Sequence, residues 1–406
     1  MKPIIFTSLL VIYLLGSSCA PRQSFDTHLN SIIKPYLFSI ARWESQALPD
    51  EIKQWLLSRQ EKQEKIDAGT VAVTEYFSLA ERIRTLQSAI TANASQGGSN
   101  PTSLETELKR LQASRAVLVS TVERILEKQI RDTLAEQGIY NPLIESKVSF
   151  PPLNFKLDQL PYLLVISPRE KIESIREKTL KPSLVLEEKT DIEARVDKLD
   201  VSSLVVEIGG LGATYPTLVS NDAGLRSTID AIVEEWLHQY LAFKPLGFLY
   251  LLDLTGISRN YEIATMNEST ASMVSKEIGS IVYNKYYPEY NNSVSQSQTT
   301  EKESDFNREM RETRRTVDIL LARGEIKQAE EFMEQKRQYL ASIGYHIRKL
   351  NQAYFAFHGT YADMPTSISP IGVELRKLRE QSTSLKDFLN RVAAMTNRQE
   401  LADSIK

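Results

Sequence analysis

The stretch Glu234-Glu-Trp-Leu-His238 decides how the rest of this sequence is interpreted. It lies in a segment from about Ala223 to Phe243 that we expect to form a helix. Positions 234 and 238 are four residues apart, so on a helix they project from the same face, one turn above the other. The stretch therefore predicts a carboxylate and an imidazole side by side, with a second carboxylate, Glu235, next to the first.

This arrangement is one residue short of the zinc-binding pattern H-E-x-x-H. That pattern needs two imidazoles one helical turn apart, a glutamate that takes a proton from water, and a third ligand from elsewhere. Glu235 and His238 fit, and Glu234 stands where the first histidine would be. A carboxylate binds zinc at about 2.0–2.2 Å and an imidazole at about 2.0–2.1 Å, so the exchange does not abolish a site on chemical grounds. In the alternative interpretation, both glutamates are helix-surface acids and His238 is a half-buried histidine.

Two neighbouring segments bear on this choice. Before the stretch, a β-branched run is broken by glycines, which predicts a strand and a turn close to a site. It reads Ser203-Leu-Val-Val-Glu-Ile-Gly-Gly-Leu-Gly-Ala-Thr-Tyr-Pro-Thr-Leu-Val219. After the stretch, Asn267-Glu-Ser-Thr-Ala-Ser272 predicts a second helix, whose small residues permit close approach of a partner helix.

A strand, a metal-binding helix and a glutamate-bearing helix, in that order, form the arrangement of the gluzincin metallopeptidases. From about Leu204 to its C-terminus the chain resembles their zinc aminopeptidase-like group, many members of which are bacterial envelope lipoproteins. The resemblance rests on four stretches: 234–238, 267–272, Ala329-Glu-Glu-Phe-Met-Glu-Gln-Lys-Arg337 and Leu350-Asn-Gln-Ala-Tyr-Phe-Ala-Phe-His-Gly-Thr-Tyr361.

By position, the resemblance implies that His238 and Glu268 are zinc ligands and that Glu235 is the general base. Glu234 departs from the family's motif, and the departure bears on catalysis more than on the fold. With Glu234 as a ligand, the set of three carries two negative charges instead of one, which tilts its preference from zinc toward harder ions such as manganese. The strand at 209–216 resembles the edge strand on which such peptidases bind an extended peptide through main-chain hydrogen bonds.

The N-terminus predicts a cellular location. A positive start is followed by twelve apolar residues from Ile4 to Leu15, and then by Gly16-Ser-Ser-Cys19, which is typical of a secretory signal. Twelve residues are too few to span a bilayer. Cys19 is the chain's only cysteine, and it resembles the acylated cysteine of a bacterial lipobox, although Gly16 stands where leucine is usual. We expect an extracytoplasmic envelope protein anchored to a membrane through Cys19; the alternative is a plain signal cleaved nearby.

The first third of the chain is expected to be helical. Apolar residues recur at helical spacing and predict two long helices that pack as a hairpin. They are Tyr76, Leu79, Ile83, Leu86 and Ile90 in one helix, and Leu104, Leu108, Leu111, Leu118, Val122 and Ile125 in the other. Between residues 140 and 216, prolines separate short β-prone runs at 162–166, 183–186 and 204–208, which predicts a small sheet above the metal helix.

The C-terminal part, from about Asp305, is expected to be helical again. His358 falls in the apolar helix 353–361 that the family places against its active site, where it would supply a replacement imidazole or polarise a substrate carbonyl. Tyr361 would be an oxyanion donor. For both residues the alternative is an ordinary core side chain.

These patterns predict an α+β fold, mostly α. We expect a lipoprotein signal at 1–19, a helical hairpin domain at 20–140, a small sheet over a gluzincin-like metal helix at 141–290, and a C-terminal helical domain at 291–406. With 49 basic and 52 acidic residues, a net charge of -3 argues against nucleic-acid binding.

Three functions fit the sequence. The first is a membrane-anchored metallopeptidase that hydrolyses peptides with zinc or manganese, with an aminopeptidase as its more specific version. The second is an inactive pseudopeptidase that binds peptides or acts as a scaffold in the envelope. The third is a helical envelope protein whose motif is a coincidence.

Overall fold

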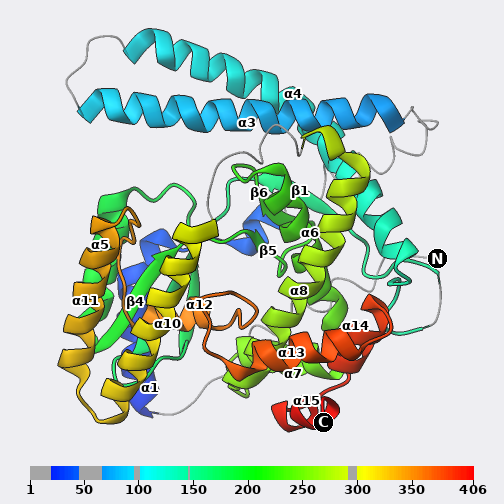
Figure 1. Cartoon of the computed structure of the whole chain (residues 1–406). Coiled ribbons are helices and arrows are strands. Elements are labelled where there is room, and N and C mark those ends of the chain that lie inside the picture. The colour runs from blue at the N-terminus through cyan, green and yellow to red at the C-terminus, as the bar shows by residue number, and fades with distance from the viewer. Residues whose placement is uncertain (1–19, 45–65, 96–100, 145–146, 291–299) are drawn as a thin grey trace.

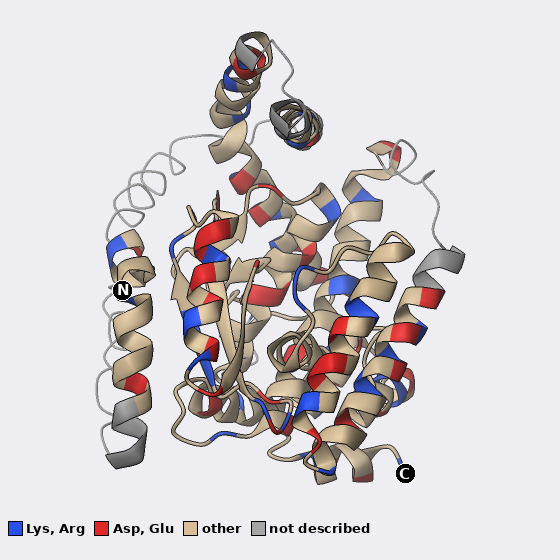
Figure 2. Ribbon diagram, turned by 90° about the vertical axis from the view of Figure 1, so that its left-hand side faces the viewer, with Lys and Arg blue, Asp and Glu red and all other residues tan. Residues whose placement is uncertain are grey.

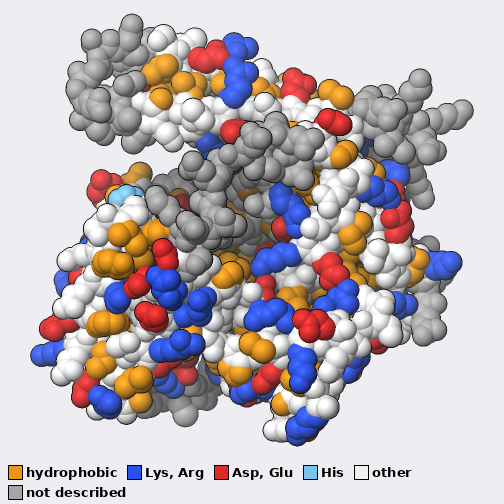
Figure 3. Space-filling view, viewed as in Figure 1, with side chains coloured by type: hydrophobic (Ala, Val, Ile, Leu, Met, Phe, Trp, Pro, Cys, Tyr) orange, Lys and Arg blue, Asp and Glu red, His pale blue; other side chains and the backbone are white. Residues whose placement is uncertain are grey.

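A computed structural model of the chain describes residues 20–44, 66–95, 101–144, 147–290 and 300–406. The described chain is mostly helical and contains two three-stranded sheets, so the predicted α+β class with mostly α content is confirmed (Figure 1). Basic and acidic residues are scattered along its helices (Figure 2). On the face shown in Figure 3, charged side chains mix with apolar ones. In this part of the chain, no helix combines the length and the apolar content needed to cross a membrane.

The predicted helical hairpin is formed by α3 (Ile66–Ser95) and α4 (Pro101–Glu136). Leu79, Ile83 and Leu111 are buried between the two helices, as their spacing predicts. After α4, Gly138 adopts a φ of 72°, the left-handed conformation that ends a helix and favours glycine. The hairpin lies along the top of the molecule in Figure 1, and its inner residues join the main core.

The first sheet has the strand order β3-β2-β4 and is antiparallel throughout. Its strands are β2 (Tyr162–Pro168), β3 (Arg176–Leu180) and β4 (Val201–Val206). Successive residues of β2 point to opposite faces. Leu164 and Ile166 pack under α1 (Ala20–Ile33) and α5 (Leu186–Asp197), next to the short helix η2 (Lys34–Tyr36). Val165 packs on the other face, against Ala353 of α12 (Gln352–Gly359).

The sequence prediction for this sheet is partly wrong. The runs at 162–166 and 204–208 overlap β2 and β4, but the run at 183–186 forms a turn that leads into α5. There the side chain of Glu188 accepts a hydrogen bond from the main-chain N–H of Val185 at 3.1 Å, which favours a helix start over a strand.

The second sheet is small and mixed, with the order β1-β6-β5. It consists of β1 (Phe155–Asp158), β5 (Gly210–Leu211) and β6 (Thr217–Ser220). β1 is parallel to β6, and β5 is antiparallel to it. Of the strand predicted at 209–216, only Gly210 and Leu211 are in β conformation, and they do form an edge of this sheet.

The main core surrounds two helices, α6 (Leu225–Leu241) and α8 (Tyr261–Tyr286). They pack closely because α8 carries small residues toward α6; a Cβ at Gly279 would collide with the carboxylate of Asp230. Four more helices cover this pair: α7 (Pro245–Leu254), α13 (Pro370–Gln381), α14 (Leu385–Ala393) and α15 (Arg398–Ser404).

The remaining helices, α10 (Thr300–Ala322) and α11 (Ile326–Ser342), pack against each other beside α12. Their shared core includes Met310, Met333 and, from α12, Phe355. The main core collects residues from three of the four predicted segments, because α3 and α4 contribute to it at one end and α13 to α15 at the other. The predicted domain boundaries stay predictions.

Candidate metal centre

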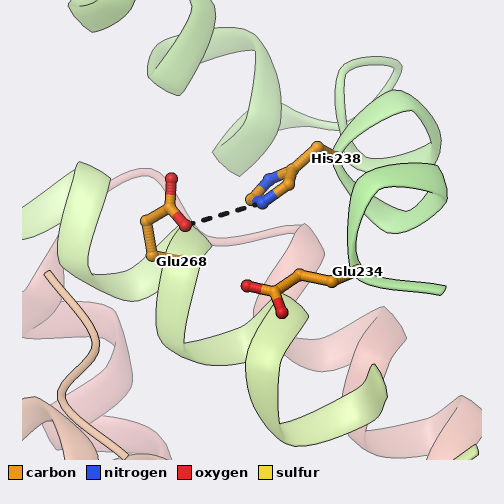
Figure 4. A group of neighbouring side chains, drawn as sticks. All are labelled: Glu234, His238 and Glu268. Carbon is orange, nitrogen blue, oxygen red and sulfur yellow. Dashed lines mark ion pairs between the residues drawn. The ribbon is translucent and has the colours of Figure 1, made fainter. Parts of the chain in front are cut away.

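Three predicted metal ligands converge where α6 and α8 pack against each other. Glu234 and His238 lie one turn apart on α6, and Glu268 reaches them from α8 (Figure 4). Each offers one ligand atom, and these atoms all lie within 4.8 Å of one another. Among the histidines, cysteines and acidic residues that the structure describes, this is the group of three or more that could hold a metal ion.

The spacing of these atoms fits a divalent ion. Atoms bound to one ion lie at most about 4.4 Å apart, which is twice the longest zinc–ligand bond. Nε2 of His238 is 3.5 Å from Oε2 of Glu268, within that limit. The 4.8 Å span of the whole group requires only a small side-chain adjustment. The side chains of His238 and Glu268 are 17% and 13% exposed, so the site is enclosed but can be reached by water.

The other ring nitrogen of His238 has a fixed partner. Nδ1 lies 2.8 Å from Oδ1 of Asn267, which can only accept a hydrogen bond. The pair therefore fixes the proton of a neutral imidazole on Nδ1 and leaves the lone pair of Nε2 facing the two glutamates. Asn267 precedes Glu268 on α8, so a single helix turn contacts both nitrogens of the ring.

Glu268 is held on both sides. Oε2 faces His238, and Oε1 accepts a hydrogen bond from the hydroxyl of Tyr250 on α7. Burial opposes ionisation of this carboxyl, but the charge of His238 and hydrogen bonds from His238, Tyr250 and Tyr361 outweigh it and lower its pKa. Tyr361, a predicted site residue, thus lies beside the metal group. Burial and the neighbouring carboxylates raise the pKa of both tyrosines well above the usual value, so both are neutral donors.

The charges of the group favour bound protons when no metal is present. Burial disfavours the imidazolium form of His238, but the carboxylates of Glu268, Glu235 and Glu234 outweigh burial and raise its pKa to about 10. Burial, together with the charges of neighbouring acids, raises the pKa of Glu234 to about 8. At neutral pH both groups are therefore protonated, and the imidazolium of His238 pairs with the carboxylate of Glu268 at 3.5 Å.

Glu235 points from α6 toward the edge strand β5. Its Oε2 accepts a hydrogen bond from the N–H of Gly212 at 2.6 Å. A Cβ at Gly210 would lie 2.5 Å from its Cγ, and one at Gly212 would lie 2.7 Å from its Oε2. These glycines are therefore required for the close approach of strand and carboxylate. Burial and the charge of Glu268 raise the pKa of Glu235 to about 7, against the opposing effect of His238.

The turn after β5 is tied to the same helix. Nε2 of Gln239 donates to the carbonyl oxygen of Gly212 at 3.0 Å and to Oγ1 of Thr217 at 3.0 Å. The edge strand and the metal helix are thus joined by side-chain bonds, which fixes β5 relative to Glu235.

The segment that carries Tyr361 is anchored to α8. Oγ of Ser269 donates to the carbonyl oxygen of Thr360 at 3.1 Å and accepts from the N–H of Ala362 at 2.8 Å. Oδ2 of Asp363 accepts from Ser272 at 2.9 Å and pairs with Lys276 at 2.6 Å. The small polar residues of the 267–272 stretch therefore position the Tyr361 loop as well as permitting close helix packing.

The structure does not bring His358 into the metal group. Its side chain is exposed, and its ring lies against that of Tyr354 with centroids 4.3 Å apart. The expected replacement imidazole is therefore not supplied by α12. Cys19 lies outside the described residues. Sequence reasoning assigned no role to Tyr250 or to the side chain of Asn267; Asn267 stood next to the predicted ligand, whereas Tyr250 gave no signal.

Comparison with known proteins found no relative of this chain. No protein-family model, no curated protein and no solved structure matches the chain.

Proposed function

We propose that this chain is a metal-dependent peptidase of gluzincin type that acts as an aminopeptidase at a membrane surface. One observation carries the proposal: Glu234, His238 and Glu268 converge from two helices, with Glu235 beside them and an edge strand next to Glu235. A coincidental motif in a helical envelope protein does not account for the distant Glu268 or for the Asn267 partner of His238.

The proposal gives each residue of the group a role. Glu234, His238 and Glu268 would hold zinc or manganese, which when bound polarises a peptide carbonyl and acidifies a water molecule. Glu235 would accept and return a proton at its carboxylate, for which a pKa of about 7 is suited. The Tyr361 hydroxyl would donate a hydrogen bond to the developing oxyanion of the substrate.

The substrate would bind along β5. As an edge of the second sheet, this strand offers main-chain groups to an extended peptide. With Glu234 in place of a histidine, the ligand set carries two negative charges instead of the one of a His/His/Glu set, which favours a peptide that carries a free α-amino group. An excess of negative charge also supports manganese as the alternative to zinc.

A second candidate function is a pseudopeptidase that binds peptides without hydrolysing them. The observation that favours it is the Gly212 N–H, which already donates to Oε2 of Glu235 and so engages one oxygen of the proposed base. In this function the edge strand and the group of carboxylates remain a peptide-binding surface, and the envelope protein serves as a scaffold.

The test uses the purified full chain, its metal content and its turnover of amino-acid amides and short peptides. We expect bound zinc or manganese, and hydrolysis that a chelator removes and the metal restores. Glu235→Gln should keep the metal and lose hydrolysis, whereas the exposed Glu331→Gln on α11 should change neither. Metal without turnover in the parent would support the pseudopeptidase. A parent that binds neither ion contradicts the metal-dependent peptidase.

The membrane anchor is proposed from the sequence of the N-terminus alone. Acyl chains on Cys19 would hold the protein at a membrane surface of the bacterial cell envelope, since each buried CH₂ contributes about 0.8 kcal/mol. Cys19→Ser should abolish labelling by a fatty-acid probe and release the protein into the soluble fraction, whereas Ser17→Ala should not. Unchanged membrane partitioning of Cys19→Ser would contradict the anchor.

A further inference from the structure

We propose that Tyr250 is a positioning residue of the metal site, which orients Glu268 through its hydroxyl group and His238 through its ring. This inference rests on the proposed metal function and extends it to a residue outside the motif. Tyr250 belongs to α7, which carries none of the three ligands, yet it contacts a ligand from each of the two helices that do.

The hydroxyl contact gives the two oxygens of the Glu268 carboxylate different partners. Tyr250 donates to Oε1, while Oε2 is the oxygen that lies 3.5 Å from Nε2 of His238. A carboxylate with one oxygen held by a hydrogen-bond donor presents the other oxygen to a metal ion. The Tyr250 contact therefore favours coordination through one oxygen of Glu268 and leaves another coordination position to a ligand from solution.

The ring contact acts on the second ligand. The ring centroids of Tyr250 and His238 are 5.8 Å apart, with an angle of 34° between the planes. The imidazole thus contacts both this ring and its hydrogen-bond partner Asn267. Both the rotation of the ring and the direction of Nε2 are restrained before a metal binds.

The position of Tyr250 is fixed by the ends of α7. At the first end, Gly247 packs so closely against the backbone of Leu241 that a Cβ would collide with its carbonyl group. At the other end, Oδ1 of Asp253 accepts from the N–H of Asn260 at 2.6 Å, and Asn260 caps α8. The tyrosine in between is therefore placed relative to α6 by main-chain packing and relative to α8 by a side-chain hydrogen bond.

The test compares Tyr250→Phe with the parent and with Tyr240→Phe. Phenylalanine keeps the ring beside His238 and removes only the donor to Glu268. Tyr240 is a matched control because it is a buried tyrosine of α6 whose ring packs on Trp236, 5.4 Å away between centroids. Affinity for zinc, manganese and cobalt is measured by competition with a coloured chelator, and the visible spectrum of the cobalt form reports the number and geometry of its ligands.

We expect Tyr250→Phe to weaken metal binding about 10–100-fold, as loss of a hydrogen-bond partner of a ligand does. The cobalt spectrum should also change as Glu268 turns to coordinate through both oxygens. Tyr240→Phe should leave affinity and spectrum as in the parent. If the parent binds metal and Tyr250→Phe binds it with the same affinity and the same cobalt spectrum, this inference is wrong while the proposed function stands. A parent that binds no metal overturns the proposed function and this inference together.

A second variant keeps the test decisive should Tyr250→Phe not fold. Incorporation of 3-fluorotyrosine at position 250 preserves the side chain and makes its hydroxyl a stronger hydrogen-bond donor. We expect a shifted cobalt spectrum with the analogue at position 250 and the parent spectrum with the analogue at position 240. Identical spectra at both positions overturn the inference.

Discussion

Nδ1 of His238 lies 2.8 Å from Oδ1 of Asn267, and the next residue on α8, Glu268, faces the opposite nitrogen of the same ring. Two consecutive residues of one helix therefore contact both ends of an imidazole that belongs to another helix. The arrangement fixes which nitrogen is free for a metal, and it places a ligand on that side.

Asn267→Ala should lower metal affinity about 10–100-fold, because the imidazole loses the acceptor that orients it. The variant should cost little stability, since Nδ2 of Asn267 is buried without a hydrogen-bond partner and alanine removes that unpaired donor too. Metal titration and thermal unfolding of the metal-free protein measure the two effects. The control is Ser275→Ala on the same helix, whose hydroxyl bonds only its own helix at Ser272. Equal losses of affinity in both variants would contradict the orienting role.

Metal affinity should rise with pH between about 6.5 and 8. The pKa of Glu234 is raised to about 8 and that of His238 to about 10, so at neutral pH both must lose a proton before they bind a metal. For each proton that the metal ion displaces, the metal affinity increases about tenfold per pH unit. Calorimetry in buffers of different ionisation enthalpy counts the protons released. Binding that releases no protons would show that these two groups are not ligands.

The stability of the metal-free protein should change in the opposite direction. The pKa of Glu234 rises from 4.5 to about 8 on folding, and that of His238 from 6.5 to about 10. The folded state thus binds more protons than the unfolded state in these windows, so the free energy of unfolding falls as pH rises from 6.5 to 8. Glu234→Gln removes one titrating group and should flatten the dependence. The same slope in parent and variant would contradict the assignment to Glu234.

Gly210→Ala should disturb the proposed base. The new methyl group would lie 2.5 Å from Cγ of Glu235, so either the strand or the carboxylate must move, at a cost of about 1–3 kcal/mol. Peptide hydrolysis should fall together with stability. Gly209→Ala is the control, because its methyl group would lie 3.8 Å from the Cβ of Ala231, an ordinary contact. A fully active and stable Gly210→Ala would mean that Glu235 needs no close contact with β5.

Local patterns predicted the parts of the site that lie on one helix. The helix expected at 223–243 is observed at 225–241, and the spacing of Glu234 and His238 follows from helical geometry alone. Glu268 was implied as a third ligand by the family resemblance, and the small residues around it do let α8 approach α6. These features depend on the order of residues within one or two elements.

Features that depend on packing between elements far apart in the sequence could not be predicted from local patterns. Tyr250 sits in an almost wholly apolar helix, and its contact with Glu268 exists only because α7 turns back over both metal helices. The strand β3, Arg-Glu-Lys-Thr-Leu at 176–180, was missed because its charged residues lack an apolar alternation, and its place is set by pairing with β2. His358 lies on a helix whose exposed side is decided by the sheet beneath it.

Glu234→His tests the departure of this chain from the H-E-x-x-H pattern. At pH 7 Glu234, with a pKa of about 8, must give up a proton to bind a metal, which weakens binding about tenfold. A histidine at this position ligates as a neutral group and also removes one negative charge from the set of ligands. We therefore expect zinc affinity to rise about tenfold, the preference for manganese over zinc to fall, and peptide hydrolysis to increase. Metal competition assays and turnover of amino-acid amides measure these changes.

The control for this variant is Glu234→Ala, which removes the charge without supplying a ligand and should bind zinc more weakly than the parent. The pair separates a ligand effect from the relief of repulsion among Glu234, Glu235 and Glu268, because relief alone would strengthen binding in both variants. Zinc binding by Glu234→His without hydrolysis would favour the pseudopeptidase, since the metal set would then be complete and the defect would lie at Glu235 or in the peptide groove. Failure of both the parent and Glu234→His to bind zinc or manganese would mean that His238 and Glu268 form an ion pair with each other and no metal site.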